Sequence, residues 1–164
     1  MHEQCVIKDG ELVSNKWHTV PKEAPGIPDG EFLIFPLAVW LANQENLCGR
    51  NNIGVWLDSE DMPTGDIASA LIKLPLLAVN FPVFTDGRGF SIARLLRERF
   101  NYKGELRAIG YVLRDQLCFM KRCGFNSFDL RENTDLKAAL ESLNDFTEYY
   151  QTSTDQPQPL FRRN

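Results

Sequence analysis

The chain has 164 residues, 43% hydrophobic and 11% aromatic, which is typical of one globular domain with a real core and excludes a disordered chain. Its 18 basic against 22 acidic residues give a net charge of −4, which excludes the broad basic surface of a nucleic-acid-binding protein. The longest apolar runs are too short to span a bilayer, and no signal peptide is visible. We therefore expect a cytoplasmic protein without membrane contact.

Residues 1–52 are predicted to form a small appendage of a single domain that covers residues 1–164. Asp9-Gly10 lies between apolar residues and predicts a β-hairpin. The proline- and glycine-rich stretch 21–30 indicates a connector, followed by a strand over 31–36 and a short amphipathic helix over 37–44. The appendage is expected to cover one sheet edge, or else a second chain completes the sheet, because bare strand edges promote aggregation.

Strand-like runs and helical patterns alternate over residues 53–150, the predicted core of the domain. The strands begin near residues 53, 77, 105 and 127, at intervals of 24, 28 and 22 residues. This alternation predicts an α/β fold of repeated strand–helix units with a mainly parallel sheet. The sheet is either half-barrel-like or open and doubly wound. The proline-interrupted tail, 151–164, either docks on its own domain or on a partner, or is disordered.

Helix boundaries follow from capping residues. The helix after the strand near residue 77 is predicted to begin at Ser91, with Arg94, Arg97 and Glu98 facing solvent. The next helix is expected to stop at Gly124, and Asn133 or Thr134 to cap the last one.

The stretch Asp86-Gly87-Arg88-Gly89 follows the second core strand, at the sheet edge where ligands of parallel sheets usually bind. Glycines, free backbone N–H groups and an arginine before a helix suit a small anion such as phosphate, sulfite or a carboxylate. The alternative is a salt-bridged turn that binds nothing. The predicted ligand-binding residues are Asp86, Gly87, Arg88, Gly89, Ser91, Arg114 and Gln116; the candidate catalytic acids are Asp86 and Asp115.

The sequence has few residues that could form a metal or redox centre. Cys118 and Cys123 are five positions apart on a predicted helix and point to different faces, so we expect reduced thiols that bind no metal. His2 and His18 lie far from the candidate site. No dinucleotide or cluster-binding motif occurs, so the cofactor is unknown, and a flavin stays open. Arg107, between Leu106 and Ala108, is expected to be a structural arginine paired with a carboxylate.

The block from Phe81 to Phe128, with "DGRG" at 86–89, "RDQL" at 114–117 and "RCGF" at 122–125, resembles a bacterial domain-of-unknown-function family, number nine-three-four. The segments "IKDGELV", "IGVWLDSED" and "PLFRR" extend the resemblance over the whole chain. One position departs from the family motif "GDVLRDQ", because Tyr111 replaces the aspartate. A mechanism that needs this acid would have to use Asp86 or Asp115.

The resemblance implies a role in sulfite reduction. It favours an accessory or electron-delivery protein of assimilatory sulfite reductase, with sulfite reductase and a small anion as partners. The alternative is a small α/β enzyme that acts on an anionic sulfur-containing or phosphorylated substrate. A homo-oligomer is compatible with either.

Overall fold

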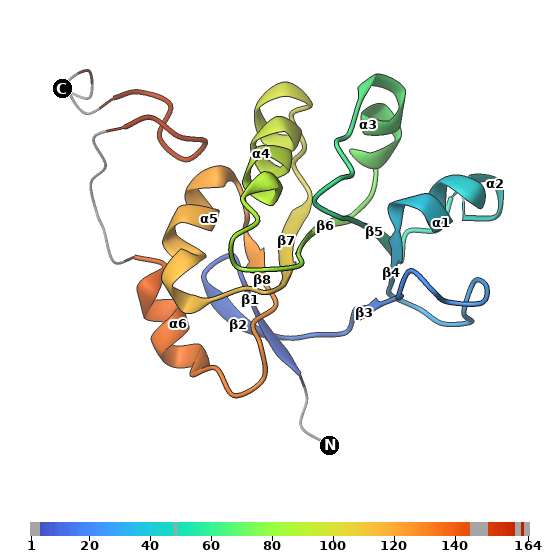
Figure 1. Ribbon diagram of the computed structural model, residues 1–164, viewed down its shortest axis with the longest axis horizontal. Helices are drawn as coiled ribbons and strands as arrows, with labels where there is room; N and C mark the ends of the chain where they lie inside the picture. Colours follow the sequence, from blue (N-terminus) through green and yellow to red (C-terminus); the bar gives the residue numbers. More distant parts are fainter. Residues whose placement is uncertain (1–3, 48, 145–150, 160–161, 163–164) are drawn as a thin grey trace.

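The computed structural model describes residues 4–47, 49–144, 151–159 and 162. Its centre is an eight-stranded sheet in the order β2-β1-β8-β7-β6-β5-β4-β3 (Figure 1). The strands are β1 (Cys5–Lys8), β2 (Glu11–Ser14), β3 (His18–Thr19), β4 (Leu33–Pro36), β5 (Ile53–Leu57), β6 (Leu76–Phe81), β7 (Glu105–Gly110) and β8 (Ser127–Phe128).

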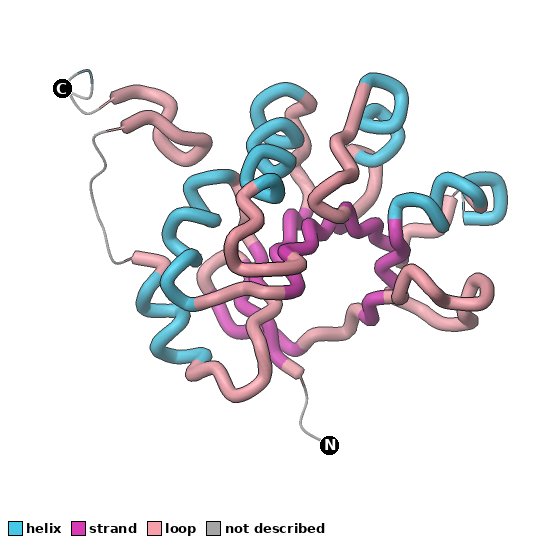
Figure 2. Tube along the Cα trace, viewed as in Figure 1, coloured by secondary structure: helices cyan, strands magenta, loops and turns pink. Residues whose placement is uncertain are grey.

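Strands β3 to β8 all run parallel, which confirms the predicted strand–helix repeat. The sheet curls strongly, with its helices on the convex side, so the half-barrel alternative is correct (Figure 2). The helical segments are α1 (Leu37–Ala42), α2 (Gln44–Leu47), α3 (Gly65–Leu71), α4 (Arg88–Arg94), η1 (Leu95–Arg99), η2 (Arg114–Gln116), α5 (Leu117–Cys123) and α6 (Leu136–Ser142). None of the described helices is long and apolar enough to cross a bilayer.

The amino-terminal segment covers both edges of the parallel core, more than the single edge expected. The hairpin β1–β2 pairs antiparallel with β8, and its turn uses positive φ at Asp9 (50°) and Gly10 (81°), as the sequence predicted. β3 and β4 extend the opposite edge beside β5. The short link between β2 and β3 passes across the open side of the curl, where Trp17 packs on the concave face (Figure 2).

Two predicted helix starts are wrong. Helix α4 begins at Arg88, three residues before Ser91, because the Asp86 carboxylate accepts the Arg88 backbone N–H at 3.1 Å and satisfies a donor of the first turn. Helix α6 is capped by Asp135, whose carboxylate accepts the N–H groups of residues 137 and 138, while Asn133 adopts φ 66° in the preceding loop.

Two further expectations about helices have opposite outcomes. Gly124 ends α5 with φ 114°, as predicted. Arg97 does not face solvent: the hydrogen bonds switch to a π-helical pattern over η1, with the Phe100 N–H bonded to the Leu95 carbonyl. The Arg97 guanidinium donates to the Gly124 carbonyl at the end of α5, and the position borders the buried face because Ala93, four residues earlier, is buried.

The main core lies between the convex face of the sheet and the helices, and Phe35, Leu77, Leu106 and Phe128 are among its buried members. The concave face holds a smaller apolar cluster around Trp56 and Ile109, with Arg107 and Glu105 in the same interior. The two faces follow the period-two alternation of the strands, and their parallel direction gathers the polar side chains after β5, β6 and β8 at one edge.

Candidate functional site

The carboxyl ends of β5 and β6 carry a connected set of polar side chains. The Asn80 amide donates to the Asp58 carboxylate at 3.1 Å, and Lys22, from the 21–30 connector, forms an ion pair with the same carboxylate. Burial alone would raise the pKa of Asp58, but the hydrogen bonds from Lys22, Ser59 and Asn80 outweigh it and hold this pKa below its usual value.

The Asp86–Arg88 pair lies in the next loop. Arg88 donates from Nε at 3.0 Å and from Nη2 at 2.7 Å to the two oxygens of Asp86, a forked geometry that fixes the guanidinium plane. The Asp86 side chain is only 9% exposed, whereas Arg88 is 56% exposed. The hydrogen bonds from Arg88 hold the pKa of Asp86 far below its usual range, so Asp86 is an ionised anchor rather than a proton donor.

The second oxygen-rich neighbour of Arg88 is Glu60, whose carboxylate lies 3.9 Å from Nη1. The corner formed by Lys22, Asp58, Glu60, Asp61, Asp86 and Arg88 therefore holds four carboxylates against two cations. We call this set the Arg88 corner. Its charge balance favours the salt-bridged turn more than the sequence alone did, and any anion bound there has to use the outward N–H groups of Arg88.

The two glycines of the corner have different roles. A side chain at Gly89 would meet the Phe81 ring at 2.7 Å, so glycine here lets α4 pack on β6. At Gly87 the nearest atom would be 3.9 Å away and φ is −86°, so the fold does not require glycine. Ser91 is exposed one turn later, within α4. Of these residues, the free approach of a ligand fits Gly87 alone.

The residues predicted from the neighbouring loop lie in and beside η2. Arg114 and Asp115 are exposed, and the Oε1 atom of Gln116 is buried without a hydrogen-bond partner. Within the part of the chain that the structure describes, no hydrogen bond or ion pair joins any of these three to the Arg88 corner. Their inclusion in one site stays a prediction.

Tyr111, the departure from the family motif, has a defined partner. The Arg131 guanidinium lies over its ring, 4.5 Å from the centroid, a cation–π contact between the loops after β7 and β8. The preceding residue is Gly110, with φ 85°, where a side chain would run into Asn80 and Phe81. An aromatic ring thus holds the cation at the position where the motif usually has a carboxylate.

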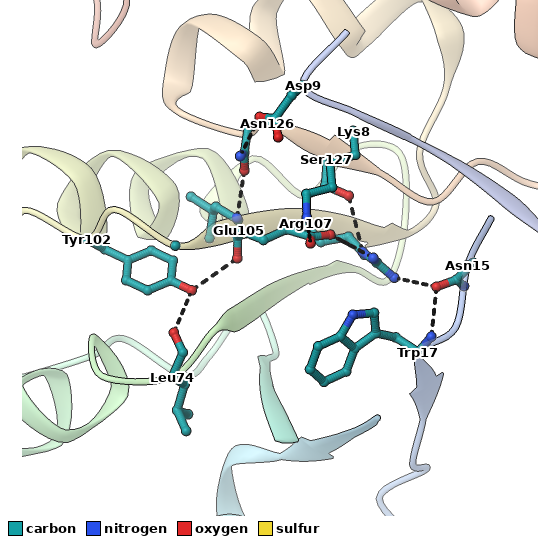
Figure 3. Close-up of polar contacts among 12 residues, drawn as sticks. Lys8, Asp9, Asn15, Trp17, Leu74, Tyr102, Glu105, Arg107, Asn126 and Ser127 are labelled. Atoms are coloured by element: carbon teal, nitrogen blue, oxygen red, sulfur yellow. Dashed lines mark hydrogen bonds and ion pairs between the residues drawn. The ribbon is translucent and has the colours of Figure 1, made fainter. Parts of the chain in front are cut away.

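Arg107 is a structural arginine with a carboxylate partner, as predicted. It donates to the Glu105 carboxylate from Nη2 at 2.6 Å, to Ser127 at 3.2 Å and to Asn15 at 2.9 Å inside the curl (Figure 3). Burial would raise the pKa of Glu105, but the charge of Arg107 and a hydrogen bond from Lys8 lower it. These contacts give the buried Arg107 a charged partner and further acceptors inside the half-barrel.

Asp129 lies at the carboxyl edge but is not among the ligand-binding or catalytic residues predicted from the sequence. It follows β8 at the carboxyl edge, is half-buried and accepts a hydrogen bond from the Gln4 amide at 3.2 Å. Burial raises its pKa, and the charge of Arg107 offsets this only in part. Its position directly after a strand was the available signal. Lys22 gave no comparable signal, because the connector folds back onto β5 only in three dimensions.

The thiols of α5 lie in different environments, since Cys118 is half-buried and Cys123 fully buried. Burial raises the pKa of Cys123 to about 11, so this thiol is unreactive at neutral pH. Among the described residues, no group of three histidine, cysteine or acidic side chains could hold a metal ion. Cys48 and His2 lie outside the described residues. The reduced state of Cys118 and Cys123 stays a prediction.

Comparison with known proteins gives a family and no closer relative. Neither a curated protein nor a solved structure matches the chain. A family model does match, over residues 54–161, which includes the core strands from β5 onward and the Arg88 corner. The chain therefore belongs to the family described as bacterial protein of unknown function (DUF934).

Proposed function

We propose that the chain is an accessory or electron-delivery protein of assimilatory sulfite reduction, which docks on sulfite reductase through the surface around Arg88 and binds a small anion there. The observation that carries this proposal is a group of exposed apolar side chains on the loop before an oriented arginine and on the neighbouring helix α5. Val83 and Phe84, in the loop that leads to Arg88, are 52% and 55% exposed, and Phe119 of α5 is 53% exposed.

The aromatic part of this surface is anchored. The ring centroids of Phe119 and Phe90 (in α4) are 4.9 Å apart, and those of Phe90 and Phe81 (in β6) are 5.1 Å apart. The exposed ring is thus held by a row of rings that reaches the core. Rigid aromatic side chains with a neighbouring arginine are the residues that contribute most to protein–protein binding. The geometry therefore supports a binding module more than an isolated enzyme.

The Arg88 corner supplies the polar part of the surface. Asp86 binds the edge of the guanidinium that carries Nε and Nη2, so the remaining N–H groups have a defined direction. A preoriented guanidinium binds a carboxylate of a partner or an oxyanion with a smaller entropy loss than a mobile one. Sulfite reductase is named as the partner because of the family resemblance; the surface itself indicates the class of interaction.

Co-purification tests the proposal. The tagged full chain, expressed in its native cell, should retain sulfite reductase, and the reductase should be less active in cells or extracts that lack the chain. The double substitution Phe84→Ser and Phe119→Ser should abolish the association. Leu41→Ser, at a 38% exposed leucine of α1, is the matched control and should leave it intact. The proposal is wrong if the reductase neither binds nor responds, or if the control has the same effect.

A second candidate, a small enzyme acting on an anionic sulfur-containing or phosphorylated substrate, is favoured by Asp129. A partly buried carboxylic acid with a raised pKa at the carboxyl edge of a parallel sheet suits a general acid or base. Turnover of such a substrate by the purified chain alone, lost in Asp129→Asn, would support the enzyme over the accessory protein.

A further inference from the structure

A second arginine-containing site lies away from the Arg88 corner. A cleft of about 550 Å³, within the range of small-ligand sites, opens between the end of the α4–η1 helix and the carboxyl-terminal tail. Its walls are Arg94, Arg97, Glu98, Tyr102 and Lys103 on one side and Thr152, Ser153, Thr154 and Pro157 on the other. The tail lies beside α4 and α5 (Figure 1).

The cleft is basic in an acidic protein. Three of its lining residues are cations and one is a carboxylate, whereas the whole chain carries a net charge of −4. Glu98 is bonded to Arg94 at 3.1 Å, which leaves the charges of Arg97 and Lys103 without a carboxylate from the cleft itself. Such a local excess of positive charge within concave walls attracts anions.

Arg97 is partly buried among neutral acceptors. Nε donates to the Gly124 carbonyl at 2.8 Å, Nη1 to the carbonyls of residues 102 and 104, and Nη2 to the Asn126 side chain at 3.2 Å. Burial lowers the pKa of Arg97, and the charge of Asp9 opposes this only in part; Asp9 accepts a hydrogen bond from the Asn126 amide at 2.9 Å (Figure 3). Among the described residues Arg97 has no ion pair, and one Nη2 N–H stays unused.

The local backbone is irregular where it presents Arg97. The Phe100 N–H bonds to the Leu95 carbonyl at 3.2 Å, five residues back, and the Tyr102 N–H bonds to Leu96 at 2.9 Å. π-Helical turns of this kind are rare and frequently occur at functional sites. Here the turn contains Arg97, one of the cations that line the cleft.

The tail wall is held in place by α5. The Thr154 N–H and the Ser153 hydroxyl both donate to the Arg122 carbonyl, and Arg122 donates from Nη2 to the Gln151 carbonyl at 2.8 Å. The Thr154 hydroxyl bonds to Glu98 across the cleft at 3.3 Å. Because the hydroxyls of residues 153 and 154 give their only hydrogen to protein acceptors, an anion in the cleft would take its donors from the cations and from the Thr152 hydroxyl.

We propose that this cleft binds a small molecule through a phosphate or sulfate group, with Arg97 and Lys103 as the cations that recognise it. A partly buried cation without an anionic partner gains from a counter-ion, and the cleft has space for the group and for part of the molecule that carries it. The site does not depend on the accessory function, because it shares no residue with the Arg88 corner or the exposed phenylalanines.

The test is an NMR titration of the full chain with inorganic phosphate and, separately, with sulfate, in an Arg88→Ala background so that the corner does not contribute. We expect saturable shifts of the backbone signals of residues 102, 103 and 154. Lys103→Glu should weaken binding about tenfold or more, the effect of losing one charged hydrogen bond and adding repulsion. Lys103 is exposed, so this substitution leaves the fold intact.

Arg99→Glu is the matched control, because Arg99 is an exposed arginine of the same η1 turn that does not line the cleft. It should change the affinity by about twofold at most, through long-range charge alone. Stronger binding of phosphate than of sulfate, or the reverse, identifies the group. The proposal is overturned if neither ion shifts the cleft signals at millimolar concentrations, or if the two charge reversals weaken binding equally.

Discussion

Arg88 and Arg97 lie nine positions apart on one helical segment, yet their surroundings are opposite. Arg88 is exposed and forked onto a carboxylate, within a corner of four acidic side chains. Arg97 is partly buried and donates to carbonyl and amide oxygens, in a cleft with excess positive charge. The sequence motif drew attention to Arg88, but from the charge balance we expect Arg97 to be the stronger anion ligand. Partners, more than motif position, decide what an arginine can bind.

Removing Arg97 should have the largest effect on stability. Arg97→Ala removes the side-chain donor of three backbone carbonyls and one of the two donors to the Asn126 oxygen, which should lower the free energy of unfolding by about 2–4 kcal/mol. Arg88→Ala should lower the urea midpoint less, because it removes a single ion pair whose arginine is 56% exposed. Urea denaturation at neutral pH measures both. Equal midpoints for the two variants would contradict the contrast between these arginines.

Substitutions at the two glycines should show which of them is needed for helix packing and which leaves room for a ligand. Gly89→Ala places a methyl group 2.7 Å from the Phe81 ring and should destabilise the fold by about 1–3 kcal/mol. In Gly87→Ala the new methyl group has no neighbour closer than 3.9 Å and φ is negative, so the free energy of unfolding should change by less than about 0.5 kcal/mol. Thermal unfolding of both variants is the measurement. A large loss at Gly87 would mean that the corner has a structural constraint that its geometry does not show.

The contributions of Asp86 and Asp129 to the free energy of unfolding should depend on pH in opposite directions. The folded pKa of Asp86 is depressed, so its contribution to stability is present above the unfolded value near 4 and is lost as pH falls. The folded pKa of Asp129 is raised, so its contribution is present below about pH 4 and is lost as pH rises through the folded value.

Urea midpoints between about pH 3 and pH 7 test these signs. Relative to the native chain, Asp86→Asn should lose less stability as pH falls below about 4, and Asp129→Asn should gain stability as pH rises from there toward 7. Parallel curves for the two variants would remove the electrostatic distinction between an anchor that holds Arg88 and a partly buried acid. They would also weaken the case for Asp129 as a general acid or base.

Local patterns predicted the elements well and their polar environments poorly. The Asp9-Gly10 turn, the strands from β5 to β8 and the stop at Gly124 all depend on nearby residues, so the sequence contains enough information to predict them. Arg97 was expected to face solvent, but it lies four positions after the buried Ala93 and donates to the Gly124 carbonyl at the end of α5. The ion pair of Lys22 with Asp58 and the hydrogen bond of Arg107 to Asn15 join residues far apart in the chain, so no local pattern predicts them.

The smallest expected effect concerns Arg131. Its partner is a neutral aromatic ring, whereas Arg88 is paired with a carboxylate and Arg97 with carbonyl and amide oxygens. In a double-mutant cycle, Tyr111 and Arg131 should couple by about 0.5–1 kcal/mol, the usual strength of an exposed cation–π contact. Tyr111→Asp gives the site the carboxylate of the family motif, and its coupling to Arg131 should be similar, about 0.2–1 kcal/mol. Salt distinguishes the two pairs. At about 0.5 M salt the ion pair that Arg131 forms in the Tyr111→Asp variant should lose most of its coupling, because exposed ion pairs are screened, whereas the native ring contact should keep more of it. Equal salt sensitivity would show that the ring acts on Arg131 mainly as a charge, and that an aromatic partner and a carboxylate partner are equivalent at this edge of the sheet.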